Sequence, residues 1–216
     1  MKQITLTGVI PDAMNETVSG SSSELWGRVL ALQQGESVLV RAASGHGKTT
    51  LCCFLSGLRQ DYAGSISFDS KDIRTFKSDD WSAVRCSQLA VMYQDLKLFD
   101  ELTAVENVQL KAALTPGIST GEITELLART GLDSKTVSRP VGTLSLGQQQ
   151  RVAFVRMLIQ PAQFRLLDEP VSHLDPDNAA ILAQMLAEKC SNDGSAVIVT
   201  STGYDMPYKY DRTILM

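Results

Sequence analysis

An apolar run followed at once by a loop of small residues most constrains the fold of this chain. Residues 37–40, SVLV, have the apolar and β-branched composition of a buried strand. The stretch VRAASGHGKTTL, residues 40–51, follows and ends in a segment that suits a helix. A buried strand, a glycine-containing loop and a helix in this order predict one unit of an α/β fold with a largely parallel sheet.

Further strand-like runs alternate with helical segments, as such a fold requires. Strands are expected at residues 4–7, 64–68, 89–92, 164–167 and 196–199, and a polar loop at residues 11–23. Two helices are expected at 103–112 and 119–130, because each begins with a capping box and Gly131 suits the end of the second. Residues 100–150 are therefore expected to form a helical lobe inserted into one domain that spans residues 1–216.

Length and charge exclude several classes of protein. A chain of 216 residues can form one well-cored domain, and its net charge of −4 gives no broad footprint for nucleic acid. No apolar run approaches the roughly 20 residues of a membrane helix, and the first residues lack a signal peptide. The cysteines have no zinc-like spacing and are expected to be reduced, buried thiols: Cys52, Cys53, Cys86 and Cys190.

The loop before the first helix is a candidate phosphate site. Its end matches the pattern G-x-x-x-x-G-K-[ST], although an alanine replaces the first glycine. In such a loop, backbone N–H groups at a helix N-terminus surround a phosphate, the lysine reaches the β- and γ-phosphates, and the hydroxyl binds Mg²⁺. The candidate contacts are Ala42, Ala43, Ser44, Gly45, His46, Gly47, Lys48, Thr49 and Thr50. A simple strand-to-helix turn is the alternative, and His46 is expected to offer only its backbone N–H.

An acidic pair at the end of a later strand supplies the second half of such a site. Asp168 is expected to bind Mg²⁺, and Glu169 to orient or deprotonate the attacking water. A solvated strand end is the alternative for both. Arg165 is unusual in a buried strand, so it is expected either to lie near a sheet edge or to pair with a carboxylate.

The segment Leu144-Ser145-Leu146-Gly147-Gln148 resembles the signature of the ATP-binding cassette (ABC) ATPases, usually Leu-Ser-Gly-Gly-Gln. Ser145 and Gln148 can form a capping box at the start of a helix, which is also an anion site. In the family this helix faces the γ-phosphate bound to another subunit. The resemblance therefore implies that Ser145, Gly147 and Gln148 contact ATP across a dimer interface.

The resemblance extends over nearly the whole chain. Gln94 in VMYQDLKLF matches the glutamine loop of the family, which implies contacts with the metal and with a membrane subunit. The segment DEPVSHLD matches the D-loop, so Asp175 is expected to contact nucleotide and to cap a helix before Pro176, and His173 to lie at the interface. The family implies a P-loop NTPase core with a mostly parallel sheet, an N-terminal antiparallel β part and the helical lobe.

Two departures from the family pattern concern catalysis and the base. Ser201 stands where the family has a switch histidine, and a serine can hydrogen-bond the γ-phosphate without carrying a positive charge to it. The first aromatic residue is Trp26, so the ring that usually stacks on adenine is expected to be missing. These residues lead to the hypothesis that the protein binds Mg-ATP, dimerises around it and hydrolyses it slowly.

The stretch YQDLKLFDELTAVENVQL is similar to cassettes that pair with lipoprotein-release, macrolide-efflux and cell-division permeases. This similarity implies a cytoplasmic protein, peripheral on the inner face of the membrane, with a permease docking near residues 94–108. Its partner cassette is identical or different, and no nucleic acid is expected. The alternatives are an ATP-gated regulatory clamp on a membrane or envelope complex and a soluble ABC ATPase that acts on DNA or ribosomes.

Overall fold

The computed structural model describes residues 1–14, 23–114 and 117–216. Most of the loop expected at residues 11–23 lies outside the described residues. Its beginning differs from the expectation, because Pro11 ends a strand and a 3-10 turn follows at η1 (Asp12–Met14).

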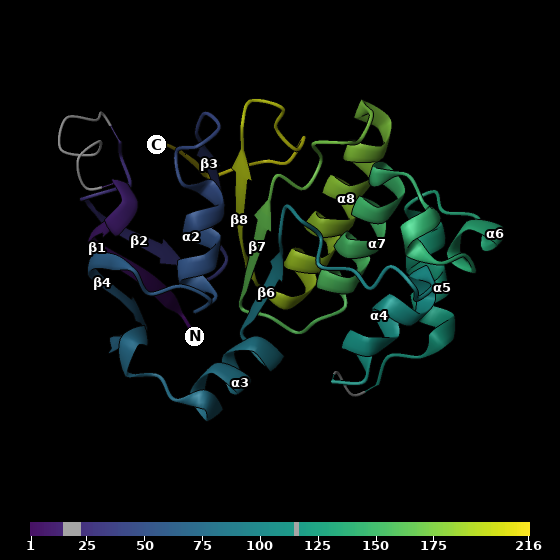
Figure 1. Ribbon diagram of the computed structural model, residues 1–216, viewed down its shortest axis with the longest axis horizontal. Coiled ribbons are helices and arrows are strands. Elements are labelled where there is room, and N and C mark those ends of the chain that lie inside the picture. Colours follow the sequence, from purple (N-terminus) through teal and green to yellow (C-terminus); the bar gives the residue numbers. More distant parts are fainter. Residues whose placement is uncertain (15–22, 115–116) are drawn as a thin grey trace.

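Two sheets organise the molecule (Figure 1). The first is antiparallel, in the order β2-β1-β4-β5, with bounds Val29–Gln33, Gln3–Pro11, Tyr62–Phe68 and Lys71–Asp72. The second is parallel, in the order β6-β7-β8-β3-β9, with bounds Leu89–Met92, Phe164–Asp168, Ala196–Ser201, Ser37–Arg41 and Arg212–Leu215. The six predicted strands and the α/β class with an antiparallel N-terminal part are confirmed; β2, β5 and β9 were not predicted.

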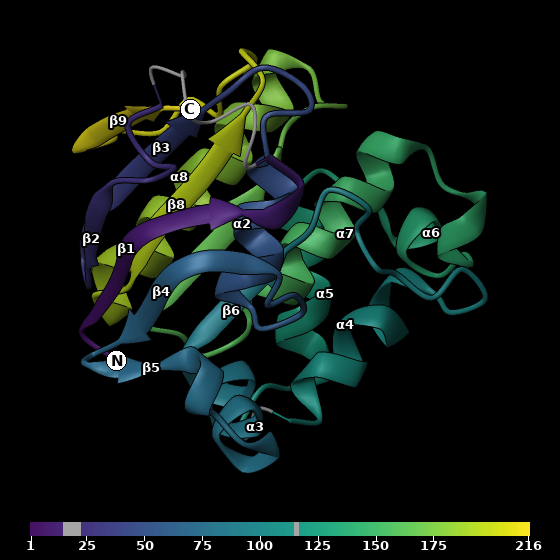
Figure 2. The same ribbon diagram turned by 60° about the vertical axis from the view of Figure 1, so that its left-hand side comes forward.

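Alternate residues of the parallel strands face two different cores. Val38 and Val40 of β3 pack into a core between the two sheets, which also holds helix α2 (Lys48–Leu55). Leu39 points to the opposite face, where helices α7 (Leu146–Leu158) and α8 (Pro176–Asp193) cover the sheet. This period of two buries both faces, which is why the strands read as unbroken apolar runs. Figure 2 shows β1 and β4 passing over α2.

The remaining helices are α3 (Ser78–Ser87), α4 (Ala104–Ala112), α5 (Thr120–Arg129) and α6 (Ser134–Val137). Of these, α4 to α6 lie on the far side of α7 from the antiparallel sheet (Figure 1). The helices predicted at 103–112 and 119–130 are confirmed, since Thr103 and Ser119 each close a capping box. Gly131 has φ +80° directly after the end of α5, a conformation that glycine adopts readily. No described helix has the length and apolarity needed to span a membrane.

The structure selects one of the two alternatives predicted for Arg165 and corrects the prediction for the cysteines. Arg165 is fully buried in β7, between β6 and β8, so it does not lie at an edge; it pairs instead with the carboxylate of Asp193. All four cysteines are free thiols, and Cys52 and Cys190 are buried as expected. Cys86, however, is exposed, because it lies on the solvent-facing side of α3.

Candidate functional site

The loop between β3 and α2 has the backbone of an anion cradle. Gly45 and Gly47 have φ of +81° and +93°, in the left-handed region that glycine adopts without strain. A side chain at Gly47 would also lie 3.1 Å from the Trp26 ring. Helix α2 begins at Lys48 with no side-chain cap, so its first N–H groups are open to a ligand.

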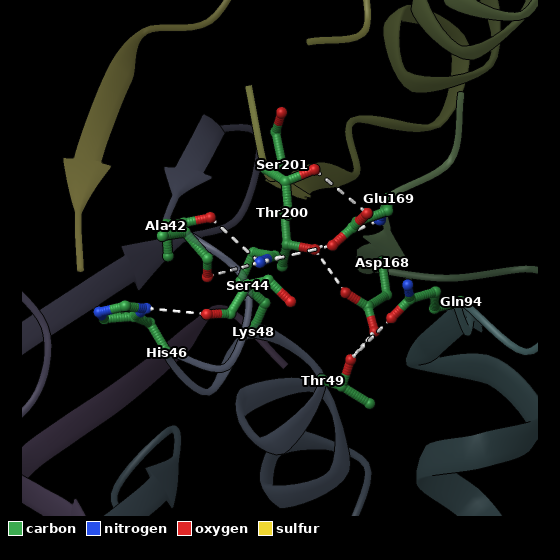
Figure 3. Close-up of polar contacts among 12 residues, drawn as sticks. Ala42, Ser44, His46, Lys48, Thr49, Gln94, Asp168, Glu169, Thr200 and Ser201 are labelled. Carbon is green, nitrogen blue, oxygen red and sulfur yellow. Dashed lines mark hydrogen bonds and ion pairs between the residues drawn. The ribbon is translucent and has the colours of Figure 1, made fainter. Parts of the chain in front are cut away.

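Lys48 lies over this loop. Its side chain is 5% exposed, and Nζ donates hydrogen bonds to the carbonyl oxygens of Ala42 (3.1 Å) and Ala43 (3.0 Å). The same nitrogen lies 3.4 Å from Oε1 of Glu169 (Figure 3). The ammonium group is thus held beside both the cradle and the carboxylate that sequence analysis assigned to water activation.

The three predicted metal ligands meet at one point. Thr49 Oγ1 donates a hydrogen bond to Asp168 Oδ2 at 2.7 Å and lies 3.3 Å from Gln94 Oε1 (Figure 3). These residues come from α2, the end of β7 and the segment after β6. A hydroxyl, an amide oxygen and a carboxylate are the oxygen donors that a hard divalent cation such as Mg²⁺ prefers.

Thr200 orients the acidic pair, a role that sequence analysis missed. It lies opposite Asp168 in the pairing of β7 with β8, and its Oγ1 donates to Asp168 Oδ1 at 2.5 Å. The backbone N–H of Glu169 donates to the Thr200 carbonyl at 3.2 Å, while Glu169 itself has φ +50°. A non-glycine residue in this region is strained, so the pairing with Thr200 holds Glu169 in a costly conformation. Only the strand register reveals this contact.

Thr200→Val is expected to lower the free energy of unfolding by about 2 kcal/mol, because it leaves a buried charged oxygen of Asp168 without its donor. Urea denaturation of both proteins measures the difference. Thr202→Val is the matched control, since Thr202 is exposed and lies 3.4 Å from Glu169 Oε2. Equal free energies of unfolding for the two variants would contradict the role of Thr200 in holding Asp168.

A cavity of about 390 Å³ joins these groups. Its walls include Ser44, Gly45, Gly47, Lys48, Thr49, Thr50, Gln94 and Glu169, together with Ala13 and Met14 from the N-terminal segment. Five residues that the sequence predicted for this part of the site are not among these walls: Ala42, Ala43, His46, Asp168 and Ser201. The His46 ring is exposed, with Nδ1 3.1 Å from the Ser44 carbonyl oxygen. Ser201 is 2% exposed, and its Oγ accepts a hydrogen bond from the Gly203 N–H at 3.0 Å.

Trp26 supports the loop from behind. Its ring is 3% exposed, and Nε1 donates to the His46 carbonyl oxygen at 3.2 Å. The ring is therefore already packed against the core, as its contact with Phe54 at 6.3 Å between centroids also shows. No face of this tryptophan is directed at the cavity as a platform for a base.

The signature segment forms the capped N-terminus of α7, on a different part of the surface. Ser145 accepts a hydrogen bond from the Gln148 N–H at 3.3 Å, and Gln148 Oε1 accepts one from the Ser145 N–H at 3.0 Å. Gly147 packs so closely that an added Cβ would lie 2.7 Å from the His173 carbonyl oxygen. None of these residues lines the described cavity of their own chain.

The loop after β7 is joined to the same helix. Buried Gln150 donates through Nε2 to the Glu169 carbonyl at 3.0 Å, and its Oε1 accepts from the His173 N–H at 3.1 Å. Asp175 caps α8 as predicted by accepting from the Asn178 N–H at 2.8 Å, and the hydrogen bonds from Asn178 lower the pKa of the Asp175 carboxyl. Gln150 thus connects the signature helix to Glu169, which no sequence motif indicated.

Comparison with known proteins places this arrangement in a family. The family model described as ABC transporter matches residues 27–172. The lipoprotein-releasing system ATP-binding protein LolD of Idiomarina loihiensis is 36% identical over 84% of this chain and 81% of its own. LolD of Psychrobacter arcticus is 32% identical over 91% and 88%. The macrolide export ATP-binding/permease protein MacB of Nitrosomonas europaea is 34% identical over 82% of this chain, which covers 27% of MacB.

Solved structures agree with these sequence matches. The dimeric structure of MJ0796, a bacterial ABC transporter cassette, superposes with a TM-score of 0.76 at 25% identity and covers 91% of this chain and 87% of its own. A post-hydrolysis dimer of MJ0796 bound to ADP and Pi also gives 0.76, at 27% identity, over 94% and 88%. One family accounts for the cradle, the acidic pair and the capped signature helix: this chain belongs to the ABC transporter family, as an ATP-binding subunit.

Proposed function

We propose that this protein binds Mg-ATP between two cassettes and hydrolyses it slowly to drive a membrane permease. One observation carries this proposal: Lys48, Thr49, Gln94 and Glu169 line one cavity, and Asp168 lies behind it, bound to Thr49. The test is ATP hydrolysis by the purified chain at high protein concentration, with and without Mg²⁺ and with and without permease-containing membranes. Hydrolysis that depends on Mg²⁺ and rises with the permease is expected.

The donor set fits a magnesium ion. Gln94 and Asp168 each present an oxygen within hydrogen-bond distance of Thr49 Oγ1, and Asp168 is fully buried and fixed by Thr200. When bound there, Mg²⁺ neutralises charge on the β- and γ-phosphates. The backbone N–H groups of the loop bind the phosphates, and Lys48 exchanges its carbonyl partners for phosphate oxygens.

Glu169 is the residue that we assign to the attacking water. Its side chain is 11% exposed at the cavity wall, and its strained backbone is fixed by Thr200 and Gln150. A carboxylate held in this way can accept a proton from water, and Lys48 stabilises its negative charge before that proton is transferred. Gln94 orients the same water or the metal, in the catalytic role that its loop implies.

A second cassette completes the site in this proposal. Ser145, Gly147, Gln148 and Asp175 lie away from the cavity of their own chain, and Leu146 beside them is 56% exposed. They are placed to contact nucleotide held by a partner, as in a cassette dimer. We propose one domain over residues 1–216, with a helical lobe at about 100–150 that carries this segment. The partner is a second copy of this chain or a different cassette.

The N-terminal segment offers an apolar wall for the base in place of a stacked ring. Ala13 and Met14 line the cavity, and the Met14 sulfur lies beside the loop, 3.3 Å from where a Cβ at Gly47 would be. A thioether packs against any aromatic base without hydrogen-bond discrimination. This supports loose base selectivity.

Ser201→His is expected to raise the single-turnover rate of ATP hydrolysis at least about tenfold, because one positioned polar group near the reacting phosphate can contribute on the order of a hundredfold. Rapid-quench measurement with excess protein gives the rate directly. Thr202→His is the control, since it places an imidazole one residue away. A Ser201→His rate no higher than that of the natural chain would refute slow hydrolysis caused by Ser201.

One observation favours a second function, an ATP-gated clamp that regulates a membrane complex with little hydrolysis. Ser201 is buried and hydrogen-bonded to Gly203, so in this conformation its hydroxyl is directed away from the described cavity. ATP binding without measurable hydrolysis, even in the presence of a permease, would select this function.

We also propose that the protein is peripheral on the inner face of the cell membrane and that the permease docks near residues 94–108. A cavity beside this segment, between α3, β6, α4 and α7, supports that placement. Leu98 and Leu102 are partly buried and Leu96 is buried, whereas Phe99 is 54% exposed and borders the cavity. Among Leu96, Leu98, Phe99 and Leu102, Phe99 is therefore the one open to a partner.

A further inference from the structure

The cavity beside the glutamine segment carries a charge opposite to that of the whole protein. It has a volume of about 330 Å³, and four of its lining residues are cationic: Arg85, Lys97, Lys111 and Arg156. None of the described residues that line it is acidic, although the chain as a whole has a net charge of −4. Lys97 is paired with Asp95, so the electrostatic site for an anion rests on the positive charges of Arg85, Lys111 and Arg156.

The two arginines at this site are held by neutral partners. Arg85 donates to the Ser56 carbonyl oxygen at 3.2 Å and lies over the Trp81 ring at 5.2 Å. Arg156 donates to the carbonyl oxygens of Leu96 and, at 2.6 Å, Lys97. Within the described part of the chain, neither guanidinium group meets a carboxylate. Both charges are therefore positioned but not neutralised.

Burial makes these charges costly. It lowers the pKa of the Arg156 guanidinium. Burial also lowers the pKa of Lys111; Cys86 opposes that change, and the positive charge of Arg156 adds to it. A carboxylate that binds beside two mutually repelling, half-buried cations gains a larger electrostatic interaction energy than one that binds beside exposed cations.

Apolar residues limit what kind of anion can enter. Leu89, Val91 and Met157 form part of the cavity wall, and the exposed side chains of Phe99 and Leu110 flank it, at 54% and 48% exposure. A nucleic-acid backbone is bound by many Lys and Arg side chains that neutralise successive phosphates, whereas this cavity is small. A cavity that combines cations with apolar walls suits an amphipathic peptide segment, whose apolar side chains cover the rim while one polar side chain enters.

We propose that this cavity binds an aspartate or glutamate side chain, carried between apolar residues on the segment of the membrane partner that docks here, with Arg85 and Arg156 as its ligands. The proposal rests on the proposed function and adds the chemistry that the docking segment must have.

The same contact gives the partner a path to the nucleotide site. Arg156 holds the carbonyls of Leu96 and Lys97, which both have left-handed φ, at 56° and 50°. Such residues are strained and keep this conformation only while other contacts hold them. A carboxylate that competes for Arg156 releases this segment, and Gln94 lies only two residues before it, in contact with Thr49.

The test is a selection of displayed helical peptides, about 14 residues or four turns long, on the purified full chain. Enriched peptides are expected to carry Asp or Glu between apolar residues. In the best peptide, replacing that acid by its amide is expected to weaken binding about tenfold, as for the loss of a hydrogen bond between charged groups. Arg85→Met should remove this preference, Arg85→Lys should keep it, and Lys135→Met, on exposed α6, should leave it unchanged.

Three outcomes would overturn the proposal. They are enriched peptides without an acid, an acid preference that persists in Arg85→Met, and displacement of the peptide by a single-stranded oligonucleotide, which would assign the cavity to polyanions. A selection that enriches nothing also counts against it. ATP binding and hydrolysis by the same preparation without peptide report on the proposed function, so the two failures are distinguishable.

Discussion

Glu169→Gln is expected to reduce steady-state ATP hydrolysis by about a hundredfold to ten-thousandfold while ATP still binds. The amide keeps the size of the side chain but cannot accept a proton from the attacking water. It also removes the carboxylate that lies 3.4 Å from Lys48 Nζ, so the lysine remains free to contact phosphate. Phosphate release measures hydrolysis, and equilibrium dialysis with labelled ATP measures binding.

The matched control is Glu125→Gln, an exposed glutamate on α5 whose replacement is expected to leave the rate unchanged. If Glu169→Gln retained the natural rate, another group would have to activate the water. If neither the natural chain nor Glu169→Gln hydrolysed ATP although both bound it, the clamp function would replace the motor function.

Asp193→Ala is expected to lower the free energy of unfolding by about 3 kcal/mol, the lower end of the effect of leaving one member of a buried ion pair alone, because Arg165 is buried while Asp193 is 27% exposed. Arg165 is fully buried in β7, with Nη2 2.9 Å from Asp193 Oδ2 and a second hydrogen bond to the Gln160 carbonyl at 3.0 Å. Removing the carboxylate leaves this guanidinium charged in the core. Urea denaturation at neutral pH measures the change.

Lys189→Ala is the matched control, because Lys189 also contacts Asp193, at 3.8 Å, but is 36% exposed. This substitution is expected to lower the free energy of unfolding by less than about 1 kcal/mol. The double variant Arg165→Leu with Asp193→Asn should recover stability, since an apolar residue in that position removes the buried charge. A single variant as stable as the control would refute the importance of the pair.

The effect of Asp193→Ala should also depend on pH. Burial alone would raise the pKa of Asp193, but hydrogen bonds from Ser195 and the charge of Arg165 outweigh it, so the pKa is lowered. A lowered pKa in the folded state contributes stability above the unfolded value of about 3.9. That contribution disappears as the pH falls through the folded value. The difference between natural and variant chains should therefore shrink in acid.

This ion pair also concerns the site. Arg165 anchors the beginning of β7, and Asp168 and Glu169 follow three and four residues later. A strand that is fixed by a buried pair at one point presents its carboxyl end in a defined position. We therefore expect Asp193→Ala to weaken hydrolysis as well as stability.

The sequence alone predicted those features that depend on residues close together in the chain. The capping boxes at Thr103, Ser119 and Ser145 form between residues three apart, and the structure contains all three. The predicted strands of the parallel sheet, β3, β6, β7 and β8, are apolar because both faces of that sheet are covered, whereas β1 and β4 of the antiparallel sheet alternate between buried and more exposed residues. By contrast, β2 and β9 have exposed positions, such as Val29 at 73% and Leu215 at 51%, which weaken the pattern.

Tertiary structure alone decided which distant residues meet. Thr200 reaches Asp168 only because β8 pairs with β7 in one register, and Arg165 finds Asp193 across 28 residues of chain. In the cavity beside the glutamine segment, the lining residues Arg85, Lys111 and Arg156 come from three different helices, α3, α4 and α7. Local hydrogen bonds and apolar periodicity depend on residues that are neighbours in the chain, so the sequence predicts them. Contacts between distant elements depend on how the strands and helices pack in the core, so they are known only from the tertiary structure.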